Sequence, residues 1–268
     1  MDLNKFFNMD ENEKPLENSA ADGGYVGIFR KIAIVGDSLA SGEHESKDLD
    51  TIEGYHDFFD YSWGQYIARL AGTTVLNFTR GGMSTKEYTE SFARNMGYWD
   101  IDKAAQCYII ALGVNDLINM NMEVGSVDDI CDEDLHRNKP TFMGCYAKII
   151  QQYKRISPDA KFFLVTMCHE RYDDDRPERD VLRKKHVQAM YDLAEHFENC
   201  YVIDLYNYSP DHDEKFRDMF YTGFHLNALG YELMGRMIVS YMDYIIRHNP
   251  LDFNQAGFIG TPYKYVKQ

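Results

Sequence analysis

The sequence predicts an α/β protein: a three-layer α/β/α doubly wound sandwich built on a five-stranded parallel sheet. Short apolar segments rich in β-branched and aromatic residues recur along the chain, and each is followed by a turn residue. Segments with helical spacing of apolar residues separate them. Strands that alternate with helices in this way are typical of βαβ units, which form a parallel sheet with helices on both faces. The expected strands are 31–35, 74–78, 107–112, 161–166 and 200–204.

Three of the intervening segments have a clear amphipathic pattern. The first begins at Phe142 and ends before Pro158, because proline disfavours a helical residue in front of it. The second spans 182–197. The third follows Asn227, a good N-cap, and ends before Pro250.

The length of 268 residues fits one large domain or two small ones, and the continuous βαβ alternation favours one. We expect an N-terminal extension at 1–28, an α/β domain at 29–248 and a C-terminal tail at 249–268. Neither end segment shows a sustained helical or strand periodicity of apolar residues.

The chain is strongly acidic, with 43 Asp and Glu against 28 Lys and Arg and a net charge of −15. A field of this sign repels phosphate backbones and anionic lipids, so neither nucleic acid nor a membrane is an expected partner. No apolar run approaches the length of a membrane span, and the N-terminus has no apolar signal region. Five cysteines without a C-x-x-C pair argue against a zinc site or disulfides. We therefore expect a cytoplasmic protein without a metal; the oligomeric state is left open.

Polar residues follow several of the predicted strands, where ligands bind in doubly wound sheets. Taken singly they are weak signals, because a serine or asparagine at such a position often caps a helix and a lone histidine is usually structural. Together, at one sheet edge and in this order, they indicate a site. The segments are Gly36-Asp37-Ser38-Leu39, Asn77 to Gly82, Gly113-Val114-Asn115-Asp116, and His225 just before the last helix.

This set of motifs resembles the SGNH hydrolases, also called the GDSL esterase/lipase family, over roughly residues 31–241. The Gly36-Asp37-Ser38-Leu39 turn matches the nucleophile block of the family, and Asn77 with Gly82 matches the second block. Gly113-Val114-Asn115-Asp116 matches the third block, and His225 with Leu226-Asn227 and Gly230-Tyr231 matches the last.

The resemblance implies a flavodoxin-like fold and a serine esterase that needs no cofactor. Ser38 would be the nucleophile and His225 the general base. The backbone amides of Ser38 and Gly82 and the side-chain amide of Asn115 would bind the oxyanion. The expected partner is a small-molecule ester.

One position departs from the family pattern, which has aspartate three residues before the catalytic histidine; this chain has Thr222. Three interpretations remain open. Asp204 or Asp218 could supply the missing carboxylate, or a Ser38 and His225 dyad could be oriented by a backbone carbonyl or by Thr222. The third is a weak or inactive catalyst that binds a ligand.

Substrate contacts are expected from residues near these motifs, namely Asp37, Tyr55, His56, Asp116 and His169. The aromatic residues could stack on a sugar ring, cover an acyl chain or simply pack the first helix. An acidic run within 117–139, if it borders the cleft, disfavours anionic substrates. The preferred substrates are therefore small or carbohydrate-linked acyl esters, with acetyl esters expected first.

Three other function classes compete with this one. A lysophospholipase or thioesterase of the same family would take longer acyl chains, and a carbohydrate-binding member would have lost turnover. A nucleotide-binding flavodoxin-like protein is disfavoured, since no G-x-G-x-x-G motif follows the first strand.

Overall fold

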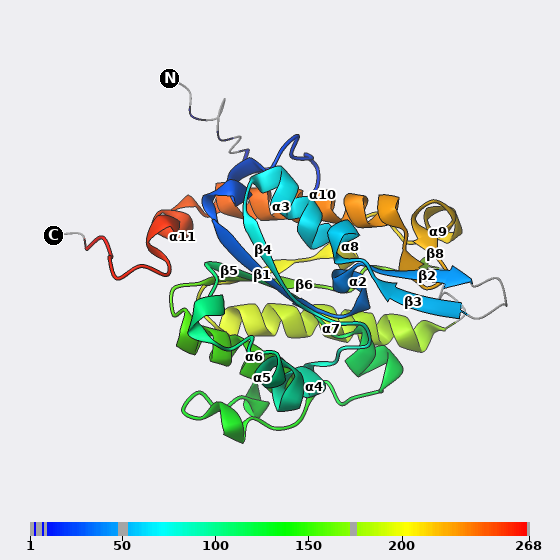
Figure 1. Cartoon of the computed structure of the whole chain (residues 1–268), viewed down its shortest axis with the longest axis horizontal. Helices are drawn as coiled ribbons and strands as arrows, with labels where there is room; N and C mark the ends of the chain where they lie inside the picture. Colours follow the sequence, from blue (N-terminus) through cyan, green and yellow to red (C-terminus); the bar gives the residue numbers. More distant parts are fainter. Residues whose placement is uncertain (1–2, 4–6, 8–9, 48–52, 172–175, 267–268) are drawn as a thin grey trace.

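A computed structural model of the chain describes residues 3, 7, 10–47, 53–171 and 176–266. It contains a five-stranded parallel sheet in the order β4-β1-β5-β6-β7, with helices on both faces, which confirms the predicted fold class (Figure 1). Each strand agrees with its predicted range to within one residue. The strands are β1 (Lys31–Gly36), β4 (Thr74–Thr79), β5 (Cys107–Ala111), β6 (Lys161–Val165) and β7 (Cys200–Ile203).

The central strand β1 shows why these segments read as continuous apolar runs. Side chains alternate between the two faces of a strand. Ile32 and Ile34 accordingly belong to one buried cluster, and Ala33 and Val35 belong to the other. Both faces are buried, so neither set of positions is polar.

Helices α3 and α10 cover one face of the sheet, and α6 and α7 cover the other (Figure 1). Shorter helices lie in the connections. The helices are α2 (Ser38–Ser41), α3 (Trp63–Ala71), α4 (Thr85–Glu87), α5 (Ala93–Asn95), α6 (Phe142–Ile156), α7 (Pro177–His196), α8 (Leu205–Tyr208), α9 (Glu214–Phe220), α10 (Ala228–His248) and α11 (Pro250–Phe253).

The three predicted helices are present, and the largest difference is at the start of α7. It begins at Pro177, five residues before the predicted position 182. Its first turn contains proline and two acidic residues, which favour a helix start but add no apolar periodicity. Helix α10 follows the predicted N-cap, because the Asn227 side chain accepts a hydrogen bond from the Gly230 amide at 3.0 Å.

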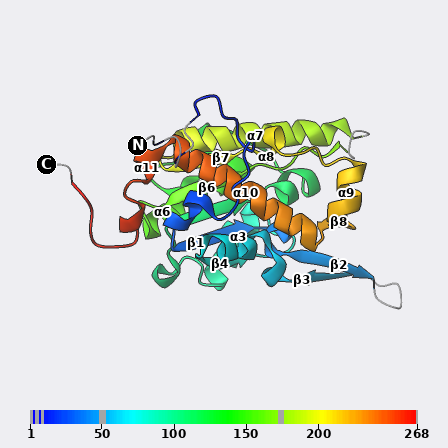
Figure 2. The ribbon, with the colours of Figure 1, turned by 90° about the horizontal axis from the view of Figure 1, so that it is seen from above.

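An antiparallel hairpin of β2 (Glu43–Lys47) and β3 (Glu53–Asp57) was not predicted. Its first strand is charged, and such residues are poor strand formers. The hairpin projects at the end of the molecule opposite the two termini (Figures 1 and 2). Strand β2 contacts β9 (His225–Leu226), which itself pairs with β8 (Tyr221–Thr222).

The described parts of both end segments pack on the α/β unit. Glu13 forms an ion pair with Arg247 of α10 at 2.7 Å, and the Gln106 side chain donates to the Ala256 carbonyl at 3.1 Å. The division at residues 28 and 249 stays a prediction. Within the described residues, no helix has the length and apolar character needed to cross a membrane.

The carboxyl end of β1 contains a buried carboxyl group. Asp37 is the N-cap of α2 and accepts a hydrogen bond from the Leu39 amide at 3.1 Å. Burial raises the pKa of Asp37 to about 7, and the negative charges of Asp116 and Glu43 act in the same direction. Ionising Asp37 therefore opposes folding.

We predict that Asp37→Asn gains stability relative to the wild type as the pH rises. Asparagine keeps the cap, and it removes a group that binds a proton more tightly in the folded state than in the unfolded chain. The wild-type penalty develops between the unfolded value of 3.8 and the folded value of about 7. Denaturant unfolding at about pH 4 and pH 8 should show a relative change of up to about 4 kcal/mol in favour of the variant. Equal changes in both proteins would contradict the buried, neutral Asp37.

Candidate active site

Ser38 lies directly after β1, as the first residue of the four-residue helix α2. The helix ends at Gly42, whose φ of +81° is a left-handed conformation that favours glycine. The Ser41 hydroxyl donates to the Ser38 carbonyl at 3.1 Å. Ser38 is 9% exposed, so only a small part of the residue reaches the surface.

Two of the expected oxyanion donors come from loops that are tied together. Gly82 follows β4 and has φ of +70°, a conformation that glycine adopts without strain. Asn115 follows β5, and its Nδ2 donates to the carbonyl of Met83 at 3.0 Å. The Asn119 side chain donates to Asn115 Oδ1 at 2.8 Å, which fixes the amide orientation. A side-chain amide has two N–H donors, so the contact with Met83 uses only one.

Asp116 is fully buried and organises the same edge of the sheet. Its Oδ1 accepts hydrogen bonds from the Thr85 amide at 2.9 Å and from the Thr85 hydroxyl at 2.7 Å. Desolvation raises the pKa of Asp116. The carboxyl group thus joins the end of β5 to the start of α4, a structural task that differs from the predicted substrate contact.

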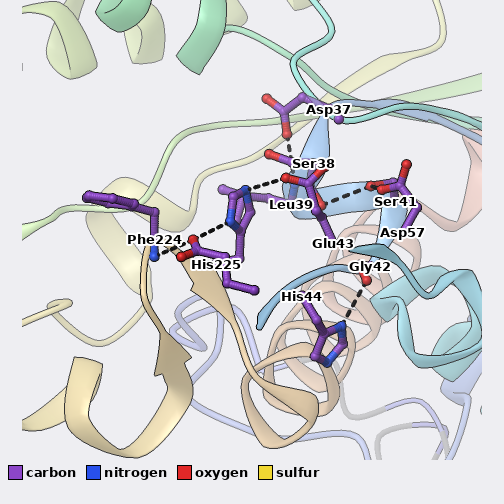
Figure 3. Close-up of polar contacts among 12 residues, drawn as sticks. Asp37, Ser38, Leu39, Ser41, Gly42, Glu43, His44, Asp57, Phe224 and His225 are labelled. Carbon is purple, nitrogen blue, oxygen red and sulfur yellow. Dashed lines mark hydrogen bonds and ion pairs between the residues drawn. The ribbon is translucent and has the colours of Figure 1, made fainter. Parts of the chain in front are cut away.

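His225 in β9 has a carboxylate beside each ring nitrogen (Figure 3). Its Nδ1 lies 2.7 Å from Glu45 Oε1, and its Nε2 lies 3.1 Å from Glu43 Oε1. Glu45 Oε1 also accepts a hydrogen bond from the Phe224 amide at 2.6 Å. Glu45 therefore holds the nitrogen that an aspartate holds in a serine triad.

Strand β2 positions both glutamates. Residues two apart in a strand point to the same face, so Glu43 and Glu45 both reach β9. Gly223 has φ of +67°, and a Cβ atom there would collide with the Glu45 carboxylate. The Tyr231 hydroxyl donates to the Glu43 carbonyl at 2.7 Å and lies 3.4 Å from the Ser38 carbonyl. The hairpin, the nucleophile turn and α10 are thus held in one arrangement.

Among the described residues, none of the three side chains expected to replace the missing aspartate forms a hydrogen bond with the His225 ring. Asp204 caps α8, and its carboxylate accepts from the amide and side chain of Asn207 at 3.0 and 2.7 Å. Asp218 is exposed on α9. Thr222 is exposed and meets His225 through the β8–β9 pairing.

Sequence reasoning missed Glu43 and Glu45. The available signal was the alternation of two glutamates shortly after the nucleophile turn. It is weak, because only the pairing of β2 with β3 and its contact with β9 bring residue 45 to residue 225.

The structure places only some of the expected substrate contacts near this site. The Tyr55 ring is 54% exposed and meets the His225 ring edge-on, with centroids 5.7 Å apart. His56 is exposed, and its Nε2 lies 2.7 Å from the Ser46 hydroxyl. His169 instead pairs with Asp211 at 2.8 Å, beyond the end of β6.

A largely apolar cavity of about 80 Å³ lies beside the nucleophile turn. Both neighbours of Ser38 line it, and other lining residues come from the ends of β5 and β6 and from α10. They include Asp37, Leu39, Leu112, Val165, Leu226, Met234 and Ile238.

Two further features bear on the expectations from sequence. The acidic run within 117–139 contains two short 3₁₀ turns, Val127–Asp129 and Leu135–Arg137, which pack against α6. Across the part of the chain that the structure describes, no group of three or more His, Cys, Asp or Glu side chains is arranged to hold a metal.

Several solved structures are similar to this chain. A family two carbohydrate esterase from Clostridium thermocellum, in complex with cellohexaose, aligns with a TM-score of 0.56 and 17% identity, covering 87% of this chain and 66% of that one. A family 2 carbohydrate esterase with a carbohydrate-binding domain from Corynascus thermopiles (Myceliophthora fergusii) aligns with a TM-score of 0.55 and 15% identity. The alignment covers 87% of this chain and 69% of that one. A Clostridium thermocellum family 3 carbohydrate esterase aligns with a TM-score of 0.52 and 16% identity, covering 81% of this chain and 96% of that one. At these identities the likeness shows the fold alone.

The curated proteins give no significant match to the sequence. The model of the GDSL-like lipase/acylhydrolase family matches residues 34–233, which is most of the α/β unit. This match confirms the resemblance seen in the four motifs, and the chain belongs to the GDSL-like lipase/acylhydrolase family.

Proposed function

We propose that the chain is a serine esterase that hydrolyses small or carbohydrate-linked acyl esters through an acyl-enzyme on Ser38. The observation that carries this proposal is the 2.7 Å contact between His225 Nδ1 and Glu45 Oε1. It supplies the carboxylate that Thr222 cannot supply, since a carboxylate at Nδ1 fixes the imidazole tautomer and stabilises the imidazolium.

In the first half-reaction, Ser38 Oγ attacks the acyl carbonyl carbon while His225 Nε2 takes the hydroxyl proton. The carbonyl oxygen becomes an oxyanion, which accepts hydrogen bonds from the amides of Ser38 and Gly82 and from Asn115 Nδ2. The intermediate then collapses. The bond to the alcohol oxygen breaks, and the leaving alcohol takes the proton from His225.

In the second half-reaction, water attacks the acyl-enzyme and gives a proton to His225. The bond to Ser38 Oγ breaks, the acid is released, and the proton returns to Ser38. The chain's own side chains account for every proton in this cycle, so no cofactor enters it.

The cavity beside the nucleophile turn supports a short acyl group. A cavity of about 150 Å³ in another protein holds a benzene ring, so the space of about 80 Å³ here suits an acyl chain of about two to four carbons. This favours an esterase for small acyl groups over the alternative, a thioesterase or lysophospholipase with a long acyl chain.

The surroundings of His225 support a neutral, ring-shaped alcohol. Tyr55 and Phe224 are 54% and 71% exposed beside it, and aromatic faces of this kind stack on sugars. Glu43 and Glu45 repel phosphate-bearing alcohols. The carbohydrate esterases among the similar structures support the same class of substrate.

The remaining alternative is a carbohydrate-binding protein without turnover. It rested on the absence of a triad acid at position 222. The carboxylate of Glu45 at His225 Nδ1 supports turnover over binding alone, because it supplies the charge that a catalytic imidazolium needs.

We predict that Ser38→Ala and His225→Ala abolish hydrolysis of p-nitrophenyl acetate and that Glu45→Gln lowers kcat/KM by about 10²- to 10⁴-fold. The glutamine keeps the shape of the side chain and removes the charge that stabilises the imidazolium. Asp218→Asn is the matched control, because it makes the same change at the exposed candidate acid. A loss in Asp218→Asn with none in Glu45→Gln would reject the assignment of Glu45.

The oxyanion role of Asn115 makes a separate prediction. Asn115→Ala should lower kcat by about 10²- to 10³-fold with little change in KM, because the lost hydrogen bond forms mainly in the transition state. Steady-state kinetics on p-nitrophenyl acetate, with the unfolding midpoint as a check on folding, measures this. A rise in KM at constant kcat would assign Asn115 to substrate binding instead.

The dependence of kcat/KM on acyl-chain length tests whether the cavity beside the nucleophile turn accommodates the acyl group. With p-nitrophenyl esters, kcat/KM should be highest for acyl chains of about two to four carbons and should fall steeply for octanoate and longer chains. Acetyl-coenzyme A, which has the same acyl group on an anionic carrier, should react more slowly than acetylated xylose or glucose. A preference for long chains or for the coenzyme A thioester would favour the thioesterase alternative.

A further inference from the structure

Glu43 occupies the position on His225 that the reaction requires for Ser38. General-base catalysis needs an unprotonated Nε2 that accepts the proton of Ser38. In the structure Nε2 faces the Glu43 carboxylate (Figure 3). The distance from Nε2 to Glu43 Oε1 is 3.1 Å, and the histidine and glutamate side chains are only 12% and 13% exposed. An ionised carboxylate at this distance from Nε2 favours the protonated ring, because a carboxylate has no proton of its own to donate.

The other ring nitrogen leads to the same conclusion about the charge of His225. Nδ1 lies 2.7 Å from Glu45, whose side chain is 10% exposed. With both glutamates ionised, the ring is an imidazolium between two carboxylates. In this state it cannot act as the base.

Glu43 also reaches the loop that is expected to bind the oxyanion. A Cβ atom at Gly81 would collide with Glu43 Oε2, so the carboxylate lies directly over the loop that continues to Gly82. It thus lies between His225 and this loop, in the space that a substrate carbonyl must enter. A carboxylate there has the shape and charge of the acid that the reaction releases.

The charges around Glu43 make this contact conditional. Asp57 on β3 and Glu45 on β2 face it and, together with burial, raise the pKa of Glu43, whereas His225 opposes the rise. His225 is the group that favours ionised Glu43. When an ester takes the place of Glu43, the Glu43 carboxylate accepts the Nε2 proton, and the neutral ring can then act as the base.

We propose that Glu43 is a specificity-determining residue that holds the Nε2 proton of His225 in the empty site and must be displaced by the incoming ester. A neutral acyl group can displace it. An acyl group that carries its own carboxylate is excluded, because it meets the same negative charges and does not form the ion pair that Glu43 forms with His225. This inference rests on the proposed roles of Ser38 and His225.

Kinetics on two acyl groups of equal length tests the selectivity. We compare p-nitrophenyl butyrate with the p-nitrophenyl monoester of succinate, for wild type, Glu43→Gln, Glu43→Ala and Asp57→Asn. Both Glu43 variants should reduce the preference for butyrate by about tenfold and should react faster with butyrate than the wild type, because no carboxylate then faces Nε2. Asp57→Asn removes one of the negative charges around Glu43 but leaves the contact between Glu43 and His225, so it should lower the preference less than either Glu43 variant does.

Two outcomes would overturn the inference while Ser38→Ala and His225→Ala remain inactive. An unchanged preference in both Glu43 variants would show that Glu43 does not select the acyl group. A slower reaction of both variants at every pH would show that Glu43 assists the chemistry.

A measurement that needs no turnover separates this inference from the proposed function. ¹⁵N NMR of histidine-labelled protein, with His225→Ala to assign the signals, should show both ring nitrogens of His225 protonated in the wild type at about pH 7 and only one in Glu43→Ala. A neutral ring in the wild type would overturn the inference whatever the activity. A protonated ring in a protein without esterase activity would keep the contact and reject the proposed function.

Discussion

Parallel pairing of five strands is the constraint on which the rest of the structure depends. It brings the ends of β1, β4 and β5 to one edge, so Ser38, Gly82 and Asn115 are neighbours although the chain separates them widely. Burial of both sheet faces by helices makes this edge the place where polar side chains can gather at the least cost. The short strand β9, just before α10, brings His225 to the same edge from the C-terminal part of the α/β unit.

The β2–β3 hairpin completes the site. A charged hairpin on its own is marginally stable. This one is held by the Tyr231 hydroxyl at 2.7 Å from the Glu43 carbonyl and by the hydrogen bond from the Phe224 amide to Glu45. The same contacts place two carboxylates on His225. Stability of the hairpin and orientation of the histidine therefore have one physical origin.

Negative charge accumulates at this edge to a degree that costs stability. Asp37 and Asp116 are buried, desolvation raises the pKa of both, and Glu43 experiences the same effect. Proteins keep such groups where function uses them or where they organise a loop. Asp116 organises the start of α4, Asp37 caps α2, and the two glutamates face the ring of His225.

The sequence by itself determined the layered α/β architecture, the strand positions to within a residue and the four family motifs, because apolar periodicity and turn residues are local signals. Ser38, Gly82, Asn115 and His225 could be named because each lies beside such a signal. The partner of His225 could not. Asp204, Asp218 and Thr222 were the natural candidates by sequence distance, whereas Glu45 lies 180 residues away in a strand that its own residues disfavour. Only the tertiary structure decided this contact, since it depends on the pairing of β2 with β3 and on the packing of that hairpin against β9, neither of which leaves a periodic trace in the sequence.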